Sequence, residues 1–115
     1  MPPFGLIFNM NMQRLQQIQE MLKSEPNDSF LNYALALEFA KSNEINKSID
    51  LINALLEREP TYLGAYYQLG QYYEQTNDTK MAMDTYSKGI VLAKQQNNRK
   101  AESELKEALF ILQDG

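Results

Sequence analysis

The sequence predicts an all-α protein of about six helices, in which antiparallel helix pairs stack into a solenoid. Three observations support this fold. Apolar residues recur at helical spacing in successive segments. Prolines and asparagines separate these segments. The chain also resembles itself after a shift of 34 residues, the distance between Pro26 and Pro60. A fixed period of this length is typical of repeat proteins whose unit is a helix pair.

The internal repeat extends well beyond the two prolines. At the 34-residue offset, residues of one class fall on residues of the same class, and this indicates one structural role at each position. The coinciding pairs include Tyr33 and Tyr67, Leu35 and Leu69, Ala36 and Gly70, Phe39 and Tyr73, Asn43 and Asn77, Ser48 and Ala82, Ile52 and Tyr86, and Leu56 and Ile90. We therefore place repeat 1 at residues 29–62 and repeat 2 at residues 63–96.

The chain before repeat 1 is expected to have two parts. Residues 1–9 form an apolar tail that lacks the basic start and the small-residue cleavage site of a signal peptide. Residues 10–24 form a helix whose apolar positions align with those of the second helix of repeat 1. These positions are Leu15, Ile18, Met21 and Leu22. We expect this helix to be half of a degenerate repeat.

Each repeat contains the chemistry that starts and stops two helices. Asp28 and Ser29 are N-cap candidates for the first helix of repeat 1. Asn43 and Asn77 stand where the chain must turn, and asparagine tolerates the left-handed conformation that closes many helices. The second helix of repeat 1 should end before Pro60, because proline disfavours helical geometry in the residue before it.

Small residues within the helices predict close contact between the two helices of a pair. Ala36 or Gly70 on the first helix and Ser48 or Ala82 on the second would allow the backbones to approach. Large neighbours would then fill the remaining space at interior packing density.

The last segment, residues 98–113, is expected to be a capping helix. It carries one apolar stripe made of Ala101, Leu105, Ala108, Leu109 and Leu112. On its polar side we expect two ion pairs between residues four apart, Lys100 with Glu104 and Glu102 with Lys106.

These residues resemble the tetratricopeptide repeat family. Repeat 2 matches the pattern best, through Tyr66, Leu69, Gly70, Tyr73, Ala82, Tyr86 and Gly89. Repeat 1 matches more loosely, through Leu35, Ala36, Phe39, Ser48, Ile52, Leu55 and Pro60. It departs at Asn32, where the family prefers a large apolar residue, and Lys94 replaces a third proline. The resemblance implies a right-handed α-solenoid that binds proteins.

Composition argues against several classes of function. The 115 residues include no Cys and no His. The usual metal ligands are therefore missing, and so are the usual pairs of a catalytic nucleophile with a general base. We expect no enzyme activity, no catalytic or metal-binding residues and no cofactor. The net charge of −4 disfavours nucleic acid as a partner. No segment approaches the length of a membrane span, so we expect no membrane contact and a cytoplasmic protein.

The resemblance implies that a peptide or helix of another protein binds on the concave face, which the first helix of each pair lines. The expected partner-binding residues are Phe30, Tyr33, Leu37 and Lys41 in repeat 1 and Tyr67, Gln68, Gln71, Glu74 and Gln75 in repeat 2. The family's clamp for acidic chaperone tails is absent, because Tyr33, Leu37 and Gln68 occupy its positions. A neutral or apolar peptide is therefore favoured.

Two alternatives remain open at this stage. Phe30, Tyr33 and Leu37 could instead pack against the N-terminal helix as core. The protein could also be a structural unit that forms a homodimer, with its groove filled by its own or a neighbour's N-terminal tail. Of the clustered tyrosines, Tyr66, Tyr73 and Tyr86 occupy packing positions, which leaves Tyr62, Tyr67 and Tyr72 as the candidates for the surface.

Overall fold

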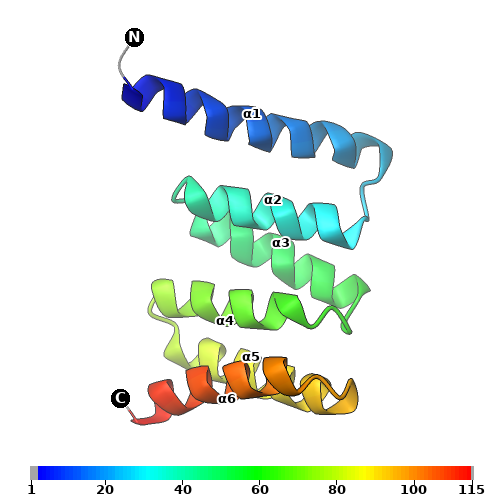
Figure 1. Cartoon of the computed structure of the whole chain (residues 1–115), viewed down its shortest axis with the longest axis vertical. Helices are drawn as coiled ribbons and strands as arrows, with labels where there is room; N and C mark the ends of the chain where they lie inside the picture. The colour runs from blue at the N-terminus through cyan, green and yellow to red at the C-terminus, as the bar shows by residue number, and fades with distance from the viewer. Residues whose placement is uncertain (1–2, 115) are drawn as a thin grey trace. The chain divides into compact units, whose positions relative to one another are not determined.

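The computed structural model describes the backbone of residues 3–114 and the side chains of residues 12–114. Within this part of the chain, all regular structure is α-helical (Figure 1), which confirms the predicted all-α fold. The helices are α1 (Pro3–Ser24), α2 (Ser29–Lys41), α3 (Ile45–Arg58), α4 (Gly64–Gln75), α5 (Thr79–Gln95) and α6 (Arg99–Asp114).

The chain forms two compact units. Unit 1 is Met1–Leu55 and unit 2 is Leu56–Gly115. The boundary falls inside α3, so this helix begins in unit 1 and its last turn belongs to unit 2. Helix pairs α2 and α3, and α4 and α5, fall within the ranges predicted for the two repeats.

The N-terminal helix of unit 1 is longer than predicted. It begins at Pro3, so residues 3–9, expected as a tail, are the first turns of α1. Proline suits the first turn of a helix because the missing N–H has no intrahelical partner there. The side chains of this segment lie outside the described residues. Further along α1, Ile18 is buried as predicted, but Met21 is 49% exposed and does not belong to the core.

Helix α2 is fixed at its start by its predicted cap and by a buried asparagine. The carboxylate of Asp28 accepts a hydrogen bond from the Leu31 N–H at 2.8 Å. The Asn32 side chain donates to the carbonyls of Pro26 (3.1 Å) and Asp28 (2.8 Å). Asn32 therefore ties the incoming loop to the helix.

Repeat 2 ties its loop in the same way with a different residue. Tyr66, which aligns with Asn32, donates its hydroxyl to the carbonyl of Pro60 at 2.8 Å. Pro60 aligns with Pro26 at the same 34-residue offset. Asn32 departs from the family pattern because its side chain is small. It nevertheless makes a hydrogen bond to the preceding loop, as Tyr66 does in repeat 2.

Small residues bring paired helices together, as predicted. In unit 1, the Ser48 hydroxyl on α3 donates to the Ala36 carbonyl on α2 at 2.5 Å, and both residues are fully buried. In unit 2, the ring of Tyr86 on α5 lies against Gly70 on α4, where a Cβ would stand 2.6 Å from two ring carbons. Gly89 on α5 similarly lies against Tyr66 and Leu105, which brings α6 close to α5.

Three of the interhelical turns contain an asparagine in the left-handed conformation. The φ angles are 62° at Asn43, 61° at Asn77 and 56° at Asn97. The first two positions were predicted from the sequence. Asn97 plays the same role after α5, and the next residue, Asn98, accepts a hydrogen bond from the Ala101 N–H at the start of α6.

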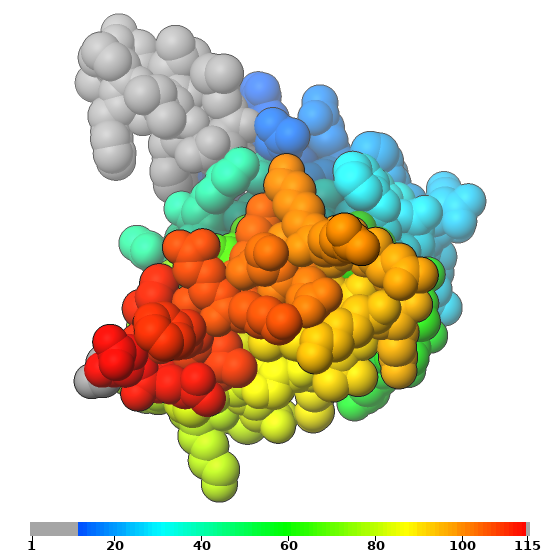
Figure 2. Space-filling view, turned by 60° about the horizontal axis from the view of Figure 1, so that its bottom comes forward, coloured from blue at the N-terminus to red at the C-terminus, as the bar shows by residue number. Residues whose placement is uncertain are grey.

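Helix α6 covers only part of the apolar surface of unit 2. Helix α6 lies beside α5 (Figure 2) and buries Leu105 and Ala108 of the predicted apolar stripe. Val91 on α5 and Phe110 on α6 remain 57% and 65% exposed.

No helix in the described part of the chain is both long and apolar enough to cross a membrane.

Candidate functional site

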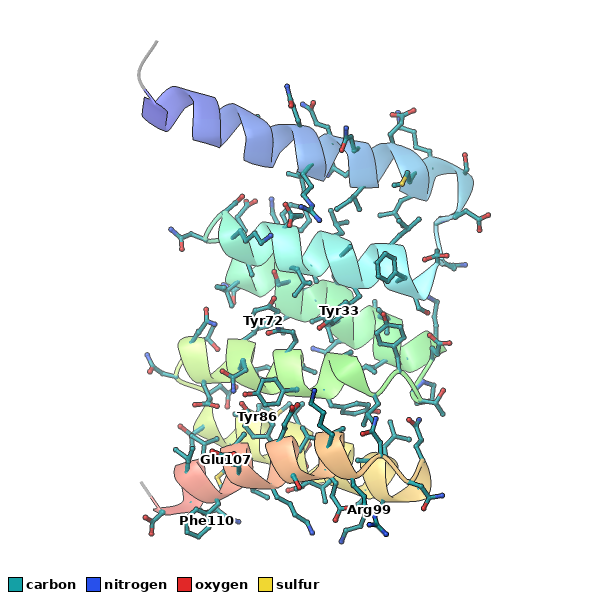
Figure 3. The ribbon with its side chains drawn as sticks, in the orientation of Figure 1. Tyr33, Tyr72, Tyr86, Arg99, Glu107 and Phe110 are labelled. Atoms are coloured by element: carbon teal, nitrogen blue, oxygen red, sulfur yellow. The ribbon has the colours of Figure 1, made fainter. Side chains whose placement is uncertain are left out.

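Unit 2 contains a hollow between α4 and α6 with a volume of about 360 Å³. We call it the α4–α6 hollow. Its lining combines an aromatic ring, apolar side chains, an amide and three carboxylates. The residues are Tyr67, Gln71 and Glu74 from α4 and Glu104, Glu107, Ala108 and Ile111 from α6. Figure 3 shows Glu107 on the side of α6 that faces α4, whereas Phe110 points away from α4.

The α4 wall follows from helical spacing. Tyr67, Gln71 and Glu74 are four and three residues apart, so they lie on one face of the helix. On another face of α4, Leu69 and Tyr73 are buried. The helix therefore packs through one face and presents polar and aromatic groups to the hollow through another.

A buried tyrosine holds this wall in place. The Tyr86 hydroxyl donates to Glu74 Oε2 at 2.5 Å and accepts from Gln71 Nε2 at 2.6 Å. Gln71 Nε2 also lies 3.4 Å from Glu74 Oε2. These contacts fix the amide and the carboxylate relative to each other, because the Tyr86 ring itself is fully buried.

The environment of Tyr86 keeps its hydroxyl protonated. Burial raises the pKa of Tyr86 well above its ordinary value of 10.0, and the hydrogen bond to the Glu74 carboxylate and its negative charge raise it further. Tyr86 therefore acts as a permanent donor to Glu74 at neutral pH.

Tyr67 provides the accessible aromatic surface of the hollow. Its side chain is 39% exposed. Its ring lies against that of Tyr86, with centroids 6.1 Å apart and an interplanar angle of 46°. Such a tilted aromatic pair is stabilising.

The α6 wall carries two carboxylates without a protein partner. Within residues 12–114, neither Glu104 nor Glu107 makes an ion pair or a side-chain hydrogen bond. The predicted pair of Glu102 and Lys106 is present at 2.7 Å, and it lowers the pKa of Glu102. The predicted pair of Lys100 and Glu104 does not form, because Glu104 is turned into the hollow.

A second hollow continues along the same two helices. It has a volume of about 190 Å³ and shares Tyr67 and Glu104 with the first. Its other lining residues are Leu63, Gly64, Gln96, Asn98, Ala101 and Leu105. Together the two hollows form one surface, which we call the α4–α6 groove.

The predicted partner-binding residues of repeat 2 lie partly in this groove. Tyr67 and Gln71 line it, and so does Glu74. Gln68 is half-buried and Gln75 is exposed, but neither lines the groove. Tyr72, one of the three candidates for the surface, is only 4% exposed. It follows Leu69 by three residues and therefore shares the buried face of α4.

The predicted residues of repeat 1 lie on α2 in unit 1, and of these Phe30 lines the hollow between α1 and α2. Phe30 is 68% exposed, so it is not core. Tyr33 and Leu37 are half-buried and do not line that hollow. Lys41 is exposed and pairs with the buried Glu38 at 2.9 Å. Their role in partner binding stays a prediction.

The contribution of α6 to the groove was not predicted from the sequence. Glu104 was expected in an ion pair with Lys100 on the polar side of the helix, and Ile111 was assigned no role. The spacing of Glu104, Glu107, Ala108 and Ile111 nevertheless places all four on one face of the helix. This face was detectable from the sequence if residues 98–113 had been considered as the first helix of a further repeat.

The groove is lined by hydrogen-bonding, apolar and acidic groups. The described residues contain no cluster of three or more acidic side chains arranged to hold a metal ion. The groups in the groove can accept hydrogen bonds, contact apolar surface and attract positive charge.

Comparison with solved structures identifies the family. The crystal structure of a tetratricopeptide repeat domain protein from Salinibacter ruber is 38% identical in sequence, with a TM-score of 0.71, and the match covers 76% of this chain and 97% of that one. The chain belongs to the tetratricopeptide repeat family. No family model matches the sequence, and no curated protein matches it at a significant level.

Two more distant tetratricopeptide repeat structures show the same fold. The TPR2B domain of yeast Sti1, in a complex with pHsp70, is 17% identical with a TM-score of 0.83, and the match covers 95% of this chain and 87% of that one. The first TPR of Spaghetti (RPAP3), bound to the HSP90 peptide SRMEEVD, is 16% identical with a TM-score of 0.70 over 89% and 79% of the two chains. This protein is thus a TPR-like helical solenoid.

Proposed function

We propose that this protein is a non-catalytic interaction module that binds a peptide or helix of another protein in the α4–α6 groove. The observation that carries the proposal is the hollow between α4 and α6, where Tyr67 and Ile111 remain exposed opposite hydrogen-bonding groups. Exposed aromatic and aliphatic side chains in a concave site are typical of ligand binding. Tetratricopeptide repeat domains in complexes with pHsp70 and with an HSP90 peptide support this class of function.

The length of the groove indicates the kind of ligand. Helix α4 has 12 residues and is therefore about 18 Å long. An extended peptide advances about 3.3 Å per residue, so about five residues would lie along it. Main-chain groups of such a peptide could donate to Glu104 and exchange hydrogen bonds with Gln71 and Asn98.

The experiment compares two neighbouring residues on α6. Ile111 lines the groove and is 61% exposed, whereas Phe110 is 65% exposed and points away from α4 (Figure 3). Peptides selected from a displayed random library by the wild-type protein are measured for affinity. We expect Ile111→Ser to raise the Kd at least tenfold, because about 1.5–3 kcal/mol of apolar burial is lost.

Phe110→Ser is the matched control and should change the Kd less than twofold. Circular dichroism checks that both variants keep the helical content of the wild type. Failure to select any peptide, or equal effects of the two substitutions, would argue against the groove.

Homodimer formation is a second candidate, favoured by the exposure of Val91 and Phe110 in unit 2. Apolar surface of this kind is a candidate interface between copies. Sedimentation equilibrium over a wide concentration range tests it. A mass that rises with concentration for the wild type but not for Phe110→Ser would support a dimer, and a constant monomer mass would exclude it.

A further inference from the structure

All charged side chains that line the α4–α6 hollow are acidic. Glu74 enters it from α4, and Glu104 and Glu107 enter it from α6, while no Lys or Arg is among its lining residues. A concave surface lined by charges of one sign favours ligands of the opposite sign. A ligand that brings positive charge would therefore meet complementary charge in the hollow.

The three carboxylates differ in their hydrogen-bond and ion-pair partners. Glu74 is held by the Tyr86 hydroxyl at 2.5 Å and by the more distant Gln71 amide at 3.4 Å. Glu104 and Glu107 have no protein partner within the described residues. By contrast, Glu102 on the same helix is paired with Lys106. The two carboxylates of α6 that line the hollow, Glu104 and Glu107, are thus left available for an external cation.

The apolar part of the lining suits the stem of a long cationic side chain. Tyr67, Ala108 and Ile111 line the same hollow as the carboxylates. Lysine and arginine bury their methylene stems against apolar surface and keep the charged end at polar groups. The exposed face of Tyr67 can in addition attract a cation through its ring quadrupole.

We propose that the α4–α6 hollow binds a lysine or arginine side chain of the partner segment, placed between Glu74 on one wall and Glu104 and Glu107 on the other. This inference rests on the proposed function and adds the chemical class of the ligand. It revises the neutral or apolar peptide expected from the sequence. An acidic segment such as the HSP90 peptide SRMEEVD, which the first TPR of Spaghetti binds, would be repelled here.

The test compares charge-neutralising variants with equal total charge. Glu104→Gln/Glu107→Gln removes two carboxylates from the hollow. Glu25→Gln/Glu57→Gln removes two exposed carboxylates that line no hollow described above. Both variants carry the same net charge, so nonspecific attraction of basic peptides changes equally in the two.

The same displayed random peptide library is selected on the wild type and on both variants. We expect basic residues to be enriched among peptides selected by the wild type and by Glu25→Gln/Glu57→Gln, but not by Glu104→Gln/Glu107→Gln. A selected basic peptide should bind the groove variant at least tenfold more weakly than the control variant. The charge reversal Glu104→Lys/Glu107→Lys should enrich acidic residues instead.

The outcomes separate this inference from the proposed function. Selected peptides that are neutral, yet lose affinity with Ile111→Ser, would overturn the basic ligand and leave the groove intact. Basic peptides that bind both glutamine variants equally would also overturn it. Peptides insensitive to Ile111→Ser would contradict the groove itself and the inference with it.

Discussion

Gly70 and Tyr86 illustrate how one residue depends on another in this protein. The fully buried Tyr86 ring occupies the space that a side chain at Gly70 would need. Its hydroxyl extends beyond the core to Glu74 and Gln71 in the hollow. The absence of a side chain at Gly70 thus helps to determine the geometry of the candidate site.

Gly70→Ala is expected to destabilise the protein by about 1–3 kcal/mol, because the new methyl group would collide with a ring that is held at both ends. This cost should exceed the gain of up to about 1 kcal/mol that alanine brings in a helix. Gly64→Ala is the matched control on the same helix, where nothing lies within 4 Å of the added carbon. Urea unfolding measures both variants, and equal stabilities for them would contradict the packing scheme.

Tyr86→Phe should cost about 1 kcal/mol at neutral pH, because the Glu74 carboxylate loses its donor. The pKa of Tyr86 is raised above 10.0 in the folded protein. Above pH 10 the unfolded chain therefore releases this proton while the folded protein retains it, and the wild type loses stability. The advantage of the wild type over Tyr86→Phe should shrink between pH 9 and pH 11 in parallel unfolding experiments. A constant difference would contradict the assignment.

At the scale of the elements, helix ends were predicted better than helix faces. The cap at Asp28 and the turns at Asn43 and Asn77 depend on local chemistry and were correct. Exposure depends on which helices lie next to each other. That is why the exposure of Met21 and the α6 wall of the hollow were not predicted from the sequence.

The asparagine turns give a direct test at this scale. Asn77 has a φ of 61°, which most residues with a Cβ adopt only at a cost of roughly 1–2 kcal/mol. Asn77→Ala should therefore lower the free energy of unfolding by about 1 kcal/mol, whereas Asn77→Gly should leave it nearly unchanged or raise it slightly. Thermal unfolding of both variants provides the measurement. An alanine variant as stable as the glycine variant would show that the turn does not require the left-handed conformation.

At the scale of the whole molecule, the 34-residue period predicted the class of fold, because a repeat fixes the same packing role many times. It predicted the α4 residues of the candidate groove, Tyr67, Gln71 and Glu74, but not those of α6. The charge of the α4–α6 hollow arises from side chains on two helices that are not consecutive in the chain. Their juxtaposition becomes visible only when the helices are in place.

The most direct test of the central claim is the mapping of amide chemical-shift changes in the ¹⁵N-labelled protein as a library-selected peptide is added. We expect the largest changes at residues of the groove, especially Tyr67, Gln71, Glu104 and Ile111, with much smaller changes in α1. Changes absent from these residues and concentrated elsewhere would contradict the claim that the α4–α6 groove is the binding site.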